Sequence, residues 1–360
     1  MENLVKTRMK DILQFYQGKR VLVTGHTGFK GTWLCHILKL AGAQVMGYAL
    51  PPPTEPSAFY LSNIEQYCQT VIGDIRDFDK LYATFRLFQP ELVFHLAAQP
   101  IVRESYIHPR ETYETNVMGT VNVLECSRLI QSVQSILNVT TDKVYYNREW
   151  VWAYRENEEL DGFDPYSNSK SCSELVTHSY RRSFFDADAA PALSTARAGN
   201  VIGGGDFAAN RIIPDCVRAA ITSKIIEVRN PHSLRPYQHV LEPLFAYLLI
   251  AMRQWEEKKY MGYYNVGPDD VDTCTTGDLV ELFIKHWGNG LNWKVQSDNG
   301  PHEANILRLD CSKMKSVFGW HPHWHVDQAV AKTAEWAKVW LDGGNLSNCM
   351  ERQIIQYLEA

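Results

Sequence analysis

Tyr166 and Lys170 are the residues whose types and spacing point most directly to chemistry. They are the first and last residues of the segment Tyr-Ser-Asn-Ser-Lys. At positions i and i+4, two side chains lie on the same face of a helix. A nearby ammonium stabilises a phenolate, so we expect Lys170 to lower the pKa of Tyr166 and make it a usable base near neutral pH. Thr141, upstream at the end of a predicted strand, offers a hydroxyl that can position a substrate alcohol.

A glycine-rich segment stands between the first predicted strand, 19–24, and a predicted helix, 32–41. Dinucleotide-binding folds require this context, because the glycines let the backbone approach a pyrophosphate and the helix N-terminus offers N–H groups to the phosphates. For the His26 side chain two interpretations stay open, a contact with the pyrophosphate and a packing role. The predicted cofactor contacts here are Gly25, His26, Thr27, Gly28, Phe29, Lys30 and Gly31.

The end of the second predicted strand indicates which dinucleotide is bound. Folds specific for NAD usually place an acid there for the ribose 2′-hydroxyl, whereas this chain has Gly47-Tyr48-Ala49-Leu50. The absence of an arginine argues against a 2′-phosphate, so the predicted cofactor is NAD rather than NADP. Asp74 is expected to meet the adenine, with a turn cap as the alternative. The remaining predicted cofactor contacts are Ile75, Leu96, Ala97, Ala98, Gln99, Asn116, Tyr166 and Lys170.

Short apolar strands alternate with helical stretches through the first half of the chain. Such alternation predicts an α/β fold, a Rossmann-type doubly wound parallel sheet with helices on both faces. After the three glycines at 203–205 the pattern changes to mixed helices, short strands and proline-containing turns. We therefore predict an NAD-binding domain at 18–200, which carries the threonine, tyrosine and lysine, and a smaller C-terminal α/β substrate-binding lobe at 201–360, with some segments exchanged between them. Strands are predicted at 19–24, 44–48, 70–72, 91–96 and 135–140, and helices at 32–41, 81–88, 113–128 and 165–185.

The glycine loop, Thr141 and the Tyr166–Lys170 pair, in this order, resemble the extended short-chain dehydrogenase/reductase superfamily over nearly the whole chain from residue 18. The triplet Thr141-Asp142-Lys143 stands where the nucleotide-sugar 4,6-dehydratases carry Thr-Asp-acid. The lysine in this triplet distinguishes the chain from the dehydratases that act on dTDP-glucose. The segments 147–156, 198–207 and 235–240 are similar to those of the dehydratases that act on CDP-glucose.

This resemblance implies a lyase that removes water from CDP-glucose with a catalytic NAD, in the pathway to the dideoxyhexoses of O-antigen lipopolysaccharide. Oxidation at C4 acidifies the C5 hydrogen, water leaves across C5–C6, and hydride returns to C6. Asp142, when protonated, would donate to the departing C6 hydroxyl. Lys143 would act as the C5 base or stabilise the enolate, and it could instead keep Asp142 ionised or be structural. The implied catalytic residues are Thr141, Asp142, Lys143, Tyr166 and Lys170.

The resemblance also implies residues that bind the sugar nucleotide. A guanidinium grips oxyanions in a planar fork, so Arg235 and Arg308 are expected to clamp the diphosphate. Any arginine taken alone is more often a solvated surface charge, and only the family context favours these two. Trp150 and Trp152 are expected to shape the sugar pocket. The full predicted set is Arg103, Asn200, Gly204, Asp206, Arg211, Arg235 and Arg308.

Composition narrows the function classes. The 360 residues carry 36 basic and 41 acidic side chains, a net charge of 36 − 41 = −5, which argues against general nucleic-acid binding. Eight widely scattered cysteines indicate free thiols in a reducing compartment. No apolar run is long enough to span a membrane, so a cytoplasmic protein is expected. The chemistry needs no metal, and His321, His323 and His325 are expected to lie in a packing turn rather than a metal site.

Two other functions stay open. A nucleotide-sugar 4-epimerase would share the fold, the tyrosine and NAD, but it needs no acid and base for C5–C6. A non-catalytic NAD sensor would commonly lose Tyr166 or Lys170, and both are present. Relatives associate through long helices, so the resemblance also implies a homo-oligomer, a dimer or a tetramer.

Overall fold

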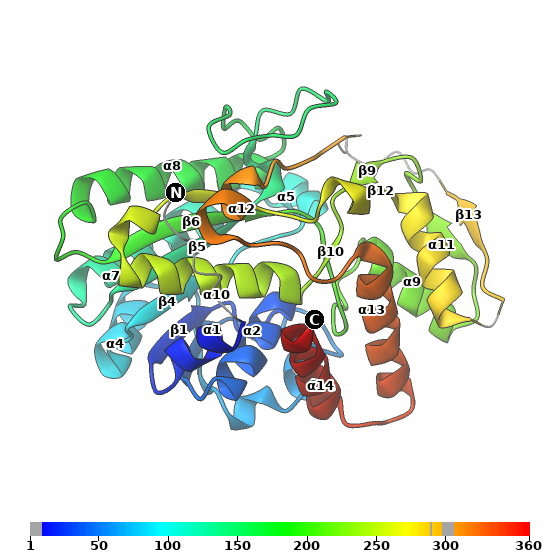
Figure 1. The fold of residues 1–360 in the computed structure, drawn as a ribbon, viewed down its shortest axis with the longest axis horizontal. Coiled ribbons are helices and arrows are strands. Elements are labelled where there is room, and N and C mark those ends of the chain that lie inside the picture. The colour runs from blue at the N-terminus through cyan, green and yellow to red at the C-terminus, as the bar shows by residue number, and fades with distance from the viewer. Residues whose placement is uncertain (1–8, 289, 297–305) are drawn as a thin grey trace.

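The computed structural model describes residues 9–288, 290–296 and 306–360, and a parallel sheet lies at its centre (Figure 1). In the described residues this sheet has seven strands in the order β11-β6-β5-β4-β1-β2-β3, and every neighbouring pair is parallel. The predicted Rossmann-type doubly wound sheet is therefore confirmed. Its strands are β1 Arg20–Thr24, β2 Gln44–Ala49, β3 Gln69–Ile72, β4 Leu92–His95, β5 Ser135–Thr141, β6 Ala192–Ala198 and β11 Tyr263–Val266.

Helices cover both faces of the sheet because its strands are apolar on both sides. In β1, Val21 and Val23 pack into one core and Leu22 into the other. One face is covered by α4 Phe78–Phe88, α7 Gly119–Leu129 and α8 Pro165–Phe184. The opposite face is covered by α1 Met9–Tyr16, α2 Phe29–Leu40, α10 Leu241–Glu256 and α14 Leu346–Glu359.

The C-terminal lobe has its own apolar core and stands at one end of the sheet (Figure 1). Parts of the second half of the chain belong to the sheet layer instead. Strand β11 pairs with β6, and α10 is tied to β5 by a hydrogen bond from Ser135 Oγ to the Ala251 carbonyl, 2.8 Å. The lobe contains α9 Ile212–Ile221, α11 Thr276–Trp287, α13 Val326–Leu341, and the short strands β7 Val201–Ile202, β8 Ile226–Val228, β9 Leu234–Arg235, β10 Gln238–His239, β12 Cys274–Thr275 and β13 Trp293–Val295.

The predicted helix at 113–128 is in fact built from three pieces. Helix α6, Pro109–Tyr113, leads into a π-helical turn at Glu114–Met118, and α7 begins at Gly119. Such π turns are frequent at functional sites, and this one turns the Asn116 side chain toward the strand ends. The short helices are α3 Ala58–Leu61, α5 Val102–Ile107 and α12 Ser312–Phe318. None of the described helices is long and apolar enough to cross a bilayer.

Candidate active site

A large cleft of about 1530 Å³ runs past the carboxyl ends of the central strands, the usual ligand position in such sheets. Its wall includes the glycine loop after β1 and Asp74 after β3. It also includes Thr141 at the end of β5, Tyr166 in the first turn of α8, and Arg235 of the lobe. One cavity therefore joins the predicted cofactor and substrate residues.

The predicted catalytic tyrosine, lysine and threonine come together at the start of α8. Asp164 caps this helix, its carboxylate accepting from Ser167 N at 3.0 Å, and so fixes the first turn that carries Tyr166. Tyr166 is hydrogen-bonded to Thr141. Lys170 lies buried one turn later and donates to the Val139 carbonyl of β5, 2.9 Å. The i, i+4 pair thus faces the strand that ends in Thr141.

The expectation that Lys170 lowers the pKa of Tyr166 is wrong for the chain alone. Burial raises the pKa of Tyr166 to about 12, against the smaller lowering effect of the Thr141 hydrogen bond. Burial also lowers the pKa of Lys170 to about 8, which weakens the charge expected to act on the phenol. The local motif predicted the contact, but the dry surroundings decided the sign of the shift.

Asp142 and Lys143 form an ion pair directly after Thr141. Oδ1 of Asp142 accepts from Lys143 Nζ at 2.9 Å and from Thr141 Oγ1 at 2.9 Å. The Asp142 side chain is fully buried, and its second oxygen, Oδ2, has no hydrogen-bond partner among the described residues. Asp142 itself does not line the cleft, whereas Thr141 and Lys143 on either side of it do. Its buried carboxylate therefore reaches the cleft wall through its contacts with these two side chains.

Lys30 belongs to the catalytic cluster as well as to the glycine loop. It lines the cleft, and its pKa is lowered to about 7, chiefly by burial and then by the positive charge of Arg211. The charges of Asp142 and Lys170 also act on it. The sequence placed Lys30 only at the cofactor, because nothing local indicates that the second residue of α2 lies near the end of β5.

The glycine loop is shaped by close packing of backbone on backbone. Gly25 has φ +75°, and a Cβ there would lie 2.7 Å from Ala97 N. A Cβ on Gly31 would lie 2.2 Å from the Gly25 carbonyl oxygen. Gly28 is different: a Cβ there would meet only the Gly25 oxygen at 3.4 Å, and the residue lines the cleft at the N-terminus of α2. This cradle of backbone N–H groups fits a pyrophosphate.

Two predicted cofactor residues turn out to have packing roles. The His26 ring fills the space that a side chain at Gly47 would need, and its Nε2 lies 3.2 Å from Thr70 Oγ1, outside the lining of the cleft. The Asn116 side chain is also buried outside that lining. It accepts from Gln99 N at 2.8 Å and donates to Ser169 Oγ at 2.9 Å, so it joins the loop after β4 to α8.

Asp74 and Ile75 line the cleft where adenine is expected, and there the sequence reasoning missed Arg76. Arg76 Nε and Nη2 donate to Asp74 Oδ2 at 2.9 and 2.6 Å. Glu111 and Glu114 lie within 3.8 Å of the same guanidinium. Because these carboxylates engage Arg76, it is poorly suited to hold a ribose 2′-phosphate. Leu96, Ala97, Ala98 and Gln99 line the cleft as predicted.

Most of the predicted substrate residues line the cleft, but two do not. A Cβ on Gly204 would lie 2.0 Å from the Trp336 ring, so this glycine serves packing rather than binding. Arg308 lies on a different wall, described below. The cleft-lining members are Arg103, Asn200, Asp206, Arg211 and Arg235.

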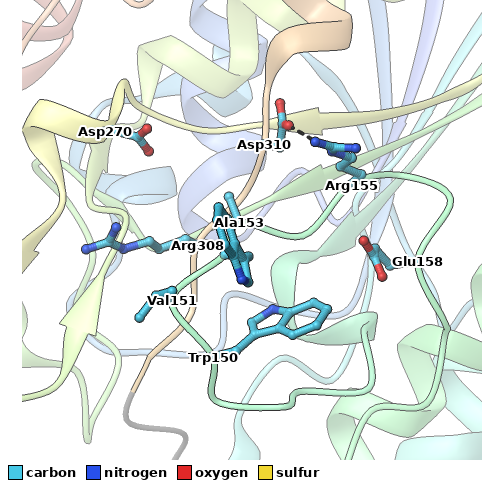
Figure 2. Close-up of a pocket in the computed structure, with 9 residues that line it drawn as sticks. Trp150, Val151, Ala153, Arg155, Glu158, Asp270, Arg308 and Asp310 are labelled. Carbon is cyan, nitrogen blue, oxygen red and sulfur yellow. Dashed lines mark hydrogen bonds and ion pairs between the residues drawn. The ribbon is translucent and has the colours of Figure 1, made fainter.

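Arg308 lines a separate pocket of about 380 Å³ rather than the cleft (Figure 2). Leu307 faces the cleft, so the next side chain along the extended segment, Arg308, falls on the opposite side. Trp150 and Trp152 line this pocket too, and Figure 2 shows Trp150 below Arg308. The structure therefore gives no support to Arg308 as a diphosphate clamp or to these tryptophans as sugar contacts.

Beneath the cleft a buried ion pair supports the catalytic helix. Glu174 of α8 accepts from Arg197 Nη2 at 3.0 Å and from Thr140 Oγ1 at 2.5 Å. Although burial opposes it, the Arg197 guanidinium lowers the pKa of Glu174 well below its usual range. Its negative charge in turn raises the pKa of Lys170, partly offsetting the effect of burial.

Together with the parallel sheet, this constellation defines the class of protein, an extended short-chain dehydrogenase/reductase. Within that class the chain belongs to the GDP-mannose 4,6-dehydratase family, whose model matches residues 22–333.

Comparison with known proteins gives relatives along nearly the full length. The chain is 48% identical over 351 residues to the CDP-glucose 4,6-dehydratase of Salmonella typhimurium, covering 96% of this chain and 98% of that protein. It is 26% identical to the UDP-glucose 4-epimerase of Mycolicibacterium smegmatis, over 88% and 97%. The fold matches the dTDP-glucose 4,6-dehydratase of Bacillus anthracis, solved in complex with NAD, with a TM-score of 0.76 at 20% identity, covering 91% of this chain and 99% of that one.

Proposed function

We propose that this chain is an NAD-dependent dehydratase that converts CDP-glucose to CDP-4-dehydro-6-deoxyglucose and water. The observation that carries the proposal is the 48% identity, over almost the whole of both chains, to a CDP-glucose 4,6-dehydratase. The cleft supports it, since one cavity is lined by the tyrosine, the threonine and Lys143, and Lys143 is ion-paired with the buried Asp142. An epimerase needs no such pair for C5–C6 chemistry.

NAD fits the cofactor half of the cleft. The backbone at the N-terminus of α2 would hold the pyrophosphate over Gly28, and Asp74 would face the adenine. The carboxylates around Arg76 favour NAD over NADP. When bound, NAD supplies a hydride acceptor whose positive ring also favours the ionised form of Tyr166.

The first step is oxidation at C4, and three side chains serve it. Tyr166 takes the proton of the C4 hydroxyl as the C4 hydride departs, and Thr141 holds the C4 oxygen. Lys170, held on the Val139 carbonyl, lies one turn away and stabilises the phenolate when it is charged. The resulting ketone makes the C5 hydrogen acidic.

The Asp142–Lys143 pair can supply both the acid and the base for the elimination. Transfer of one proton along the 2.9 Å contact, from Lys143 Nζ to Asp142 Oδ1, yields a neutral amine and a carboxylic acid. The amine then takes the C5 proton, the acid protonates the departing C6 hydroxyl, and water leaves. Hydride returns to C6, and the ammonium of Lys143 gives the proton back to C5. The C4 proton held by Tyr166 then passes to the neutral amine of Lys143, so that all three groups regain their starting protonation.

This mechanism predicts the behaviour of Lys143→Ala. Solvent deuterium incorporation at C5 and overall turnover should fall by about 10²-fold or more, the usual contribution of a general base, while NAD affinity stays within about threefold. The measurement is NMR of the product formed in D₂O, with fluorescence titration for NAD. Unchanged turnover would remove Lys143 from the mechanism.

The proposed function itself is tested by incubating the purified protein with NAD and CDP-glucose. A dehydratase forms a 4-keto sugar, which absorbs in alkali, and mass spectrometry shows the loss of one water. An epimerase would give an isomer without a keto sugar, and a sensor would give no product. Either result would overturn the proposal.

Three further features are proposed with this function. The pathway is that of the dideoxyhexoses of O-antigen lipopolysaccharide, and the location is the cytoplasm, which agrees with eight free cysteines. The chain forms a homo-oligomer through α7 and α8, which carry exposed Leu129 and Leu175. Light scattering after size-exclusion chromatography distinguishes a monomer from a dimer or tetramer.

A further inference from the structure

The direction of the substrate in the cleft follows from the positions of the catalytic tyrosine, which must meet the sugar, and of the lobe, which must receive the nucleotide. The cofactor occupies the half between the glycine loop and the catalytic tyrosine, so the nucleotide of the substrate must extend the other way, into the lobe. Arg211 and Arg235 are two of the arginines that line the cleft there, and we expect them to meet the diphosphate. The base must then lie beyond them, at what we call the distal end of the cleft. Its lining residues are Ile213, Pro214, Asp215, Glu227, Arg229 and Asn230.

Glu227 faces the distal end because of the alternation in β8. Ile226 and Val228 are fully buried in the lobe core, whereas Glu227 between them is directed outward and its side chain is 57% exposed. Strand β13 brings Lys294 opposite Glu227, with Nζ 3.1 Å from Oε1. Within the described part of the chain this is the only ion pair of Glu227.

The other acids near this end are already engaged by arginines. Asp206 is paired with Arg211 at 2.9 Å, and Asp215 is paired with Arg218. An exposed lysine contact such as that of Glu227 is weak and easily rearranged, with a typical value of about 0–1 kcal/mol. Glu227 is the more exposed of the two acids at the distal end, 57% against 35% for Asp215, and its partner is a lysine rather than an arginine fork, so it is the acid better placed to accept a hydrogen bond from a ligand.

We propose that Glu227 selects the base of the nucleotide sugar by accepting a hydrogen bond from the exocyclic amino group of cytosine. An ionised carboxylate only accepts, and cytosine presents a 4-amino donor where uracil and thymine present a 4-keto acceptor. With either of these bases the carboxylate would face a carbonyl oxygen, which loses the hydrogen bond and adds repulsion. This inference rests on the proposed function and names the residue that determines its base preference.

The test compares Glu227→Gln with the wild type on CDP-, UDP- and dTDP-glucose. The amide keeps the size of the side chain but can turn its NH₂ group toward a 4-keto oxygen. The preference for CDP-glucose is the ratio of its kcat/KM to the kcat/KM of UDP- or dTDP-glucose. This ratio should fall at least tenfold, and the fall should come from changes in KM rather than in kcat. Calorimetry with CDP and UDP alone should show the same loss of preference without turnover.

Two matched variants separate base reading from a structural effect. Lys294→Gln removes the ion pair but keeps Glu227, and Glu256→Gln neutralises an exposed, ion-paired acid outside the lining of the cleft, so both should retain the preference within about twofold. A Glu227→Gln enzyme with unchanged preference, or with equal losses on all three substrates, overturns the inference while leaving the dehydratase function intact. A wild-type protein that converts none of the three substrates overturns the proposed function and this inference with it.

Discussion

The two halves of the cleft are built by different means. The cofactor half is shaped by backbone packed on backbone, with Gly25 against Ala97 and Gly31 against Gly25. The substrate half is shaped by side chains: Glu227 faces Lys294 across two short strands, and Asp206 in the loop after β7 holds Arg211 at the start of α9. Backbone packing tolerates almost no added atom, whereas an exposed ion pair such as that of Glu227 and Lys294 costs little to rearrange. The first half is therefore suited to an unvarying cofactor and the second to choice among substrates.

The largest expected effect lies where the halves meet, at Tyr166. Tyr166→Phe should lower kcat by about 10³-fold, within the 10²–10⁴ range of a general base, because no other group accepts the C4 proton. Affinities for NAD and CDP should stay within about threefold, as measured by calorimetry. Retention of more than a tenth of the activity would mean that another group is the base.

A second prediction concerns the cofactor half. Gly31→Ala should destabilise the fold by about 1–3 kcal/mol, since its Cβ would lie 2.2 Å from a backbone oxygen. Gly28→Ala is the matched control: its Cβ would meet that oxygen at 3.4 Å, so the unfolding temperature should hold while NAD binding weakens. Equal unfolding temperatures for the two variants, measured by calorimetry, would contradict the packing argument.

A third prediction concerns the substrate half. Arg235→Gln should raise the KM for CDP-glucose about tenfold without changing NAD affinity, because one charge-assisted contact to the diphosphate is lost. Arg308→Gln should leave KM within about twofold, since Arg308 lines the separate pocket. Steady-state kinetics measures both KM values. A similar rise in KM for the two variants would mean that Arg235 does not bind the diphosphate in the cleft.

A fourth prediction is a pH dependence of the free energy of unfolding, caused by Lys30. Its pKa is about 7 in the folded chain, and an unfolded lysine titrates near ~10.4, so between these values the unfolded state binds more protons. The free energy of unfolding of the wild type should therefore rise with pH across this window relative to Lys30→Met. Thermal unfolding should show the variant gaining most near pH 6–7 and the gain shrinking toward pH 10. If the stability gain of Lys30→Met did not change with pH, the pKa of Lys30 would not be lowered in the folded chain.

Local patterns were enough to predict five of the seven strands of the sheet, the loop and the catalytic pair, whereas β6 and β11 were not predicted. Glycine spacing, strand alternation and the i, i+4 rule depend on covalent neighbours, so they can be read along the chain. The main error of this kind was at 113–128, where a π turn interrupts the helix and directs Asn116 toward Gln99. A single inserted residue in a helical turn leaves no periodic signal in one sequence.

By itself, the sequence determined the class of fold, the dinucleotide loop and which tyrosine and lysine meet. Only the tertiary structure decided that His26 packs under Gly47, that Arg308 faces away from the cleft, and that Lys30 joins the catalytic cluster. It also reversed the expected pKa shift of Tyr166. The physical reason is that contacts between segments distant in the chain decide how deeply a side chain is buried and whether it faces the cleft. Residue spacing along the sequence does not encode these contacts.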